Sequence, residues 1–126
     1  MMDVLIVDDH PVIRELFRQL VETHPDLSVA AEVTSGEDAI AQATILQPSI
    51  ALVDVHLPTI SGIETTKCIK AKSPCTVIIG LTAGEPNDQD KAMIAAGASA
   101  VINKADAVHC LYPLIIEAAR SMKTAT

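Results

Sequence analysis

Three aspartates follow directly after two apolar runs of the sequence. Asp8 and Asp9 come after the run at 4–7, and Asp54 comes after the run at 50–53. Each run has the length and β-branched content of a strand that is buried on both faces. Such strands are usually parallel, so their carboxyl ends meet at one edge of the sheet. Carboxylates that meet there raise each other's pKa unless a cation joins them, and the pattern therefore predicts a divalent metal beside a reactive aspartate.

Two later apolar runs, at 76–82 and 100–103, also end in functional groups. Thr82 closes the first run, and Lys104 follows the second. Ligands of open α/β sheets bind beyond the carboxyl ends of the strands, so all these side chains are expected to converge there. Their composition matches phosphoryl transfer. Carboxylates hold Mg²⁺, an aspartate can become an aspartyl-phosphate, and a lysine and a threonine can bind the phosphoryl oxygens.

The rest of the chain predicts the elements that position these groups. Strand-like and helix-like segments alternate five times, which favours an α/β fold with a doubly wound parallel sheet and helices on both faces. The expected strands cover residues 4–8, 27–33, 50–54, 76–82 and 100–103. The helices after them end near residues 21, 46, 72, 96 and 122, and a turn is expected at 84–88. The segment at 27–33 is the least continuous apolar run, as expected of an edge strand.

Local signals mark several helix ends. Ser35 with Asp38 forms a capping box at the start of the second helix, and Gly97 suits a left-handed cap after the fourth. Pro113 lies inside the last helix and removes an N–H that would bond the carbonyl of residue 109, so a kink or a delayed start is expected. The apolar face of the first helix is expected to consist of Val12, Ile13, Leu16, Phe17, Leu20 and Val21.

Composition indicates one globular domain over residues 1–126. The net charge of −7, with one Tyr, one Phe and no Trp, disfavours direct binding of nucleic acid. Cys68, Cys75 and Cys110 lack the spacing of a zinc site, so we expect buried free thiols in a reducing compartment. No apolar run approaches the roughly 18 residues of a membrane span, and we expect a cytoplasmic protein without membrane contact.

In their order along the chain, these motifs resemble the receiver domain of two-component response regulators. The resemblance covers essentially the whole length and rests on the pair Asp8–Asp9, Asp54, Pro58 with Gly62, the pair Thr82–Ala83, and Lys104. The run from Asp8 to Pro11, which includes His10, resembles the NarL-type subgroup, whose receivers precede a helix-turn-helix domain. The fold that this implies is flavodoxin-like, with five parallel strands in the order 2-1-3-4-5.

The resemblance implies a role for each matching residue. Asp54 would be the phosphoacceptor and would receive a phosphoryl group from a phosphohistidine of a sensor histidine kinase. Lys104 would pair with the phosphoryl oxygens, and Thr82 would move to hydrogen-bond the phosphate. The metal, Mg²⁺ or Mn²⁺, would take its protein ligands from Asp8 or Asp9 or both, from Asp54, and from the backbone carbonyl of His56.

The function implied is a signalling switch and not an enzyme with many turnovers. Phosphorylation would change the face made by the fourth helix, the fifth strand and the fifth helix, and a homodimer could follow. DNA would be bound only through a C-terminal domain outside this chain, and a stand-alone regulator that acts by protein contacts is the alternative. An aspartate-nucleophile phosphatase of the haloacid dehalogenase kind is disfavoured, because Asp8 and Asp9 are adjacent and no acid pair of that kind follows Lys104.

Some positions leave the readout of the switch open. Family members often carry an aromatic residue three positions before the lysine, where this chain has Val101. Pro113 lies in the implied output face, which we therefore expect to be atypical.

His10 and His56 flank the site. His10 is expected to cap or line the first helix and His56 to point into the following loop, with tuning of the phosphoryl lifetime as the alternative role for both.

Overall fold

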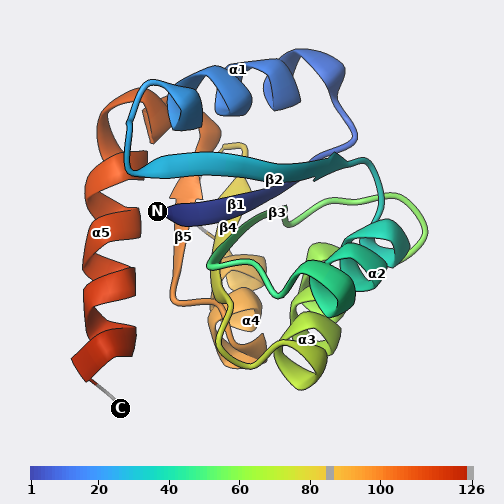
Figure 1. The fold of residues 1–126 in the computed structure, drawn as a ribbon. Helices are drawn as coiled ribbons and strands as arrows, with labels where there is room; N and C mark the ends of the chain where they lie inside the picture. Colours follow the sequence, from blue (N-terminus) through green and yellow to red (C-terminus); the bar gives the residue numbers. More distant parts are fainter. Residues whose placement is uncertain (85–86, 125–126) are drawn as a thin grey trace.

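The sheet has the strand order that the sequence predicts. The computed structural model describes residues 1–84 and 87–124. In this part of the chain, five parallel strands are arranged in the order β2-β1-β3-β4-β5 (Figure 1). They are β1 Met2–Val7, β2 Leu27–Val33, β3 Ile50–Asp54, β4 Val77–Thr82 and β5 Ala100–Asn103. The predicted α/β fold is therefore confirmed, including the edge position of β2.

Helices cover both faces of the sheet. They are α1 Pro11–Glu22, α2 Gly36–Leu46, α3 Gly62–Lys72, α4 Asp88–Ala96 and α5 Ala107–Thr124. Figure 1 shows α1 and α5 against one face and α2, α3 and α4 against the other. Successive residues of β1 alternate between these layers, since Ile6 packs in the cluster with Phe17 of α1, whereas Leu5 packs in the cluster with Ala39 of α2. Burial on both faces explains the uninterrupted apolar runs of the central strands.

The register of the strands places the first two predicted groups beside each other. β1 and β3 are paired up to Val7 and Val53. Asp8 and Asp54 are the next residues on these two neighbouring strands, and both are buried. Parallel pairing therefore puts two buried carboxylates at the same edge of the sheet.

The loop after β3 lies against the strand at Gly62. A Cβ atom at this position would lie 2.1 Å from the carbonyl oxygen of Asp54, which leaves no room for a larger residue. The N–H of Gly62 donates to the carbonyl of Val55 at 2.9 Å. Ser61 caps α3, because its hydroxyl accepts a hydrogen bond from the N–H of Glu64 at 3.2 Å. This loop thus holds the backbone that carries Asp54.

Two other helix-end signals are confirmed. The N–H of Asp38 donates to the hydroxyl of Ser35 at 3.2 Å, so Ser35 caps α2 as predicted. Gly97 ends α4 with a φ of 124°, a backbone conformation that favours glycine. The turn predicted at 84–88 includes residues 85 and 86, which lie outside the described residues.

The course of α5 contradicts the expected delay at Pro113. The helix begins at Ala107, well before the proline, and continues through it to Thr124. A short 3₁₀ turn, Lys104–Asp106, leads into it. Residues on both sides of the proline are buried against the sheet, and this packing outweighs the loss of one helical hydrogen bond.

Some expectations about burial were wrong. Val12 is 80% exposed, because it lies in the first turn of α1 and outside the face that packs on the sheet. Cys75 and Cys110 are free but exposed, and Cys68 is partly buried. No helix in the described part of the chain is long and apolar enough to cross a membrane.

Candidate functional site

Three of the predicted side chains meet in one ion-pair cluster. The Nζ atom of Lys104 lies 2.7 Å from Oδ2 of Asp8 and 3.2 Å from Oδ2 of Asp54. The side chain of Asp8 is fully buried, and those of Asp54 and Lys104 are only 3% and 13% exposed. Asp54 and Lys104 are 50 positions apart in the sequence. They come together because β3 and β5 run in the same direction and end at the same edge.

Asp54 is held in an environment that disfavours its charge. Burial, and then repulsion by Asp8, raise the pKa of its carboxyl group above the usual value. The N–H of His56, which donates to Oδ1 at 3.0 Å, and the ammonium group of Lys104 oppose this rise without cancelling it. An added cation at this edge would therefore favour the ionised, nucleophilic form of Asp54.

Lys104 keeps its positive charge in the cluster. Burial by itself lowers the pKa of a lysine, but the close contact with Asp8 and the charge of Asp54 outweigh it, so the pKa of Lys104 is raised. Oδ2 of Asp8 is buried and accepts no well-directed hydrogen bond from the described residues, so its 2.7 Å contact with Lys104 is an ion pair. One ammonium group thus faces two buried carboxylates.

Asp9 and His10 form the more exposed side of the cluster. Their side chains are 37% and 63% exposed. The Nδ1 atom of His10 lies 3.0 Å from Oδ1 of Asp8 and 3.2 Å from Oδ1 of Asp9. His10 occupies the N-cap position of α1, but its side chain makes no capping hydrogen bond, so the expected capping role is wrong. Sequence reasoning did not place its ring among the acidic groups, although its position next to two aspartates was the available signal.

Thr82 and His56 lie beside the cluster. Thr82 is 4% exposed at the end of β4, the strand next to β3. It lines a surface hollow of about 440 Å³ together with Val101, the residue at the usual aromatic position. His56 is exposed, and its backbone touches the cluster through the N–H bond to Asp54. The movement of Thr82 and a ligating carbonyl at His56 stay predictions.

The donor atoms of this edge suit a hard divalent cation. One ligand atom from each of Asp8, Asp9, His10 and Asp54 can be chosen so that all four lie within 4.8 Å of one another. Carboxylate oxygens are the ligands that Mg²⁺ prefers, usually with several waters retained. Because the oxygens of three aspartates gather at this edge and Oδ2 of Asp8 lacks a directed hydrogen bond, these residues fit Mg²⁺ or Mn²⁺.

Comparison with known proteins decides the family. The family model described as the response regulator receiver domain matches residues 4–112. The chain belongs to this family. This receiver domain is 38% identical over 106 residues to a protein-glutamate methylesterase/protein-glutamine glutaminase of Syntrophus aciditrophicus, covering 82% of this chain and 30% of that protein. It is 33% identical over 101 residues to a nitrate/nitrite response regulator homologue of Haemophilus influenzae, covering 80% of this chain and 49% of that protein.

A solved structure of a response regulator is also similar to this chain. The receiver is similar to a two-component response regulator of the LuxR family from Aurantimonas sp. SI85-9A1, with a TM-score of 0.82 and 27% identity over 93% of this chain and 86% of that one. The nitrate/nitrite relative agrees with the resemblance to NarL-type regulators. The chain spans 30% and 49% of the lengths of the two curated relatives.

Proposed function

We propose that residues 1–126 form one receiver domain that acts as a phospho-accepting switch in a two-component phosphorelay, with Asp54 as the phosphoacceptor. The observation that carries this proposal is the buried carboxylate of Asp54, with Asp8 beside it and Nζ of Lys104 at 3.2 Å from its Oδ2. A carboxylate with no role beyond solvation of the surface would not be buried and paired with a lysine in this way. The switch changes state by phosphorylation and is not an enzyme with an external substrate turned over many times.

The chemistry follows from the charges of the cluster. An ionised oxygen of Asp54 attacks the phosphorus of a phosphohistidine, so that a P–O bond forms and the P–N bond breaks. The imidazole leaves with the electron pair and takes a proton from water. Lys104 favours the ionised form of Asp54 and pairs with the phosphoryl oxygens once they arrive. Asp8, Asp9, Asp54 and the carbonyl of His56 would hold Mg²⁺ or Mn²⁺, which would supply neutralisation of the developing negative charge.

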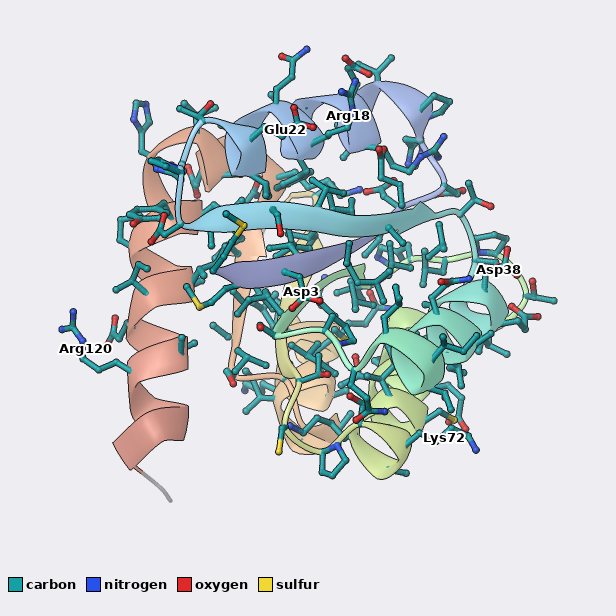
Figure 2. The ribbon with its side chains drawn as sticks, viewed as in Figure 1. Asp3, Arg18, Glu22, Asp38, Lys72 and Arg120 are labelled. Atoms are coloured by element: carbon teal, nitrogen blue, oxygen red, sulfur yellow. The ribbon has the colours of Figure 1, made fainter. Side chains whose placement is uncertain are left out.

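Intact mass measurement tests the acceptor. The receiver is incubated with Mg²⁺ and acetyl phosphate, and one added phosphoryl group is expected. Asp54→Asn should abolish the addition, and chelation of the metal should suppress it. Asp3→Asn is the matched control, because Asp3 lies at the amino end of β1, away from the carboxyl edge (Figure 2). Full labelling of Asp54→Asn would contradict the assignment of Asp54.

The same incubation separates the switch from a phosphatase. A switch should release phosphate only through its own labelled aspartate, and the release should stop when the phosphoryl donor is exhausted. A phosphatase would turn over simple phosphate esters many times. Repeated turnover of p-nitrophenyl phosphate that depends on Asp54 would favour the phosphatase.

We further propose a sensor histidine kinase as the phosphoryl donor and a C-terminal helix-turn-helix domain, outside this chain, as the transcriptional output. Support for the output comes from the NarL-type relative and the LuxR-family structure. A homodimer on phosphorylation is the proposed link to that output. The free cysteines fit a reducing compartment such as the cytoplasm. Reading the gene past residue 126 tests the output, because a basic helical segment there supports it and a stop codon favours a stand-alone regulator.

A further inference from the structure

The ring of His10 lies among the carboxylates that are proposed to hold the cation. Its Nδ1 atom is 3.0 Å from Oδ1 of Asp8 and 3.2 Å from Oδ1 of Asp9. Two ligands at right angles around one metal ion, with bonds of about 2.1 Å, are separated by about 3.0 Å. The spacing of the imidazole nitrogen from each carboxylate therefore matches that of neighbouring ligands on a single ion.

The backbone holds His10 in this position. Its N–H donates to Oδ1 of Asp8 at 2.9 Å, and its carbonyl accepts the N–H of Arg14 at 3.0 Å in the first turn of α1. Arg14 also donates from its guanidinium group to the carbonyl of Asp8 at 2.9 Å. In the described part of the chain, the ring makes no hydrogen bond or ion pair other than those with Asp8 and Asp9. The imidazole is thus placed at the cluster and serves no other visible contact.

An imidazole changes which metal ions a site prefers. Carboxylates and water suit Mg²⁺ and Mn²⁺, whereas imidazole suits Ni²⁺, Cu²⁺ and Zn²⁺. In the absence of metal, an N–H on Nδ1 faces the two carboxylates. When a metal binds, this proton can reside on Nε2 instead, so that the lone pair of Nδ1 faces the ion without a change in the charge of the ring.

We propose that His10 is a specificity-determining ligand, which shifts this acidic site from Mg²⁺ towards imidazole-binding divalent ions such as Ni²⁺. The inference rests on the proposed function, because the cation is the one proposed there for Asp8, Asp9 and Asp54. A transition ion held through His10 competes with Mg²⁺ for the receiver.

Titration calorimetry of the whole chain with Ni²⁺ and with Mg²⁺ tests the role of His10. Transition ions differ in affinity for any site, so the informative quantity is the change in the Ni²⁺-to-Mg²⁺ affinity ratio when the ring is removed. His10→Ala and His10→Asn should each weaken Ni²⁺ binding by about 10-fold or more, on the scale of losses seen even for outer-shell partners of metal ligands. The affinity for Mg²⁺ should change little. His109→Ala is the matched control, because His109 is exposed on α5 and outside the cluster.

Nuclear magnetic resonance adds the position of the bound ion relative to the ring of His10. Substoichiometric Ni²⁺ should broaden the ring resonances of His10 strongly and those of His109 weakly. Equal broadening of the two rings, or an equal loss of Ni²⁺ and Mg²⁺ affinity in both His10 variants, would overturn the inference.

These outcomes are separable from a failure of the proposed function. A wild-type protein that binds neither ion, or an Asp54→Asn variant with unchanged Mg²⁺ affinity, contradicts the cation site itself and the role of His10 with it. Loss of acetyl phosphate labelling with the ion selectivity intact contradicts the phosphoacceptor proposal and supports the role of His10.

Discussion

Replacing Lys104 by methionine should lower the stability of the metal-free receiver, and a bound cation should restore part of the loss. The substitution keeps an apolar stem but leaves Asp8 and Asp54 buried without the ammonium group that lies 2.7 Å and 3.2 Å from them. Removal of one partner from a buried ion pair costs about 3–5 kcal/mol. Because the lysine side chain retains 13% exposure, some water reaches the cluster, and we expect the lower end of that range, about 3 kcal/mol.

The loss should depend on pH with a definite sign. The pKa of Asp54 is already raised in the folded protein, first by burial and then by Asp8, and it rises further without Lys104. A carboxyl group with a raised folded pKa stabilises the fold below its unfolded pKa, and this contribution is lost as the pH rises through the folded pKa. The difference between Lys104→Met and wild type should therefore be smallest in acid and grow as the pH rises through the folded pKa of Asp54.

Urea denaturation at several pH values, in chelator and in Mg²⁺, measures this difference. Mg²⁺ at 100 times its dissociation constant adds about 2.7 kcal/mol to any protein that binds it only when folded. It should restore more of the stability of the variant, because the competing ammonium is gone. Lys67→Met is the control, since Lys67 is exposed on α3 and outside the cluster. A Lys104→Met variant as stable as wild type at neutral pH in chelator, or a loss that is the same at all pH values, would refute this reasoning.

Three further predictions concern other parts of the molecule. Gly62→Ala should cost about 1–3 kcal/mol in urea denaturation, because the new Cβ would lie 2.1 Å from the carbonyl oxygen of Asp54; an unchanged midpoint would contradict the close approach. Val101→Tyr should cost less than about 1.5 kcal/mol by the same assay, because the residue borders a hollow of about 440 Å³, and a larger loss would show that the hollow does not accept a ring. Asp26→Ala should lower the pKa of Tyr112, whose hydroxyl donates to Asp26 at 2.7 Å, and the two proteins should converge in stability as the pH rises through the raised folded pKa of the tyrosine. A phenolate absorbance titration that is the same in both proteins would contradict this contact.

Much of the site was predictable because strand direction determines where strand ends lie. Buried apolar runs predict parallel strands, and parallel strands bring Asp8, Asp54 and Lys104 to one edge whatever their separation in the sequence. The convergence of these three groups could therefore be predicted from the topology of the sheet. The ring of His10 was not predictable in this way. Its place among the carboxylates depends on a side-chain rotamer and on the path of the chain into α1, and neither has a sequence periodicity.

The expectations for Val12 and Pro113 failed because tertiary packing decides both positions. Val12 fits the helical apolar pattern, yet it lies on the exposed side of the first turn of α1. Pro113 should weaken a helix locally, but α5 passes through it because Leu111 and Ile115 are buried against the sheet. Local rules count hydrogen bonds near one residue, whereas packing sums contacts from residues far apart in the chain.

By itself, the sequence determined the strand and helix order, the edge where chemistry can occur and the kinds of group found there. These follow from hydrophobic periodicity and from the directionality of parallel strands. Only the tertiary structure decided the distances and charges at that edge, including the bridging ammonium of Lys104 and the imidazole of His10. The distances depend on how side chains pack at the strand ends, and burial and neighbouring charges together shift the pKa values of Asp54 and Lys104.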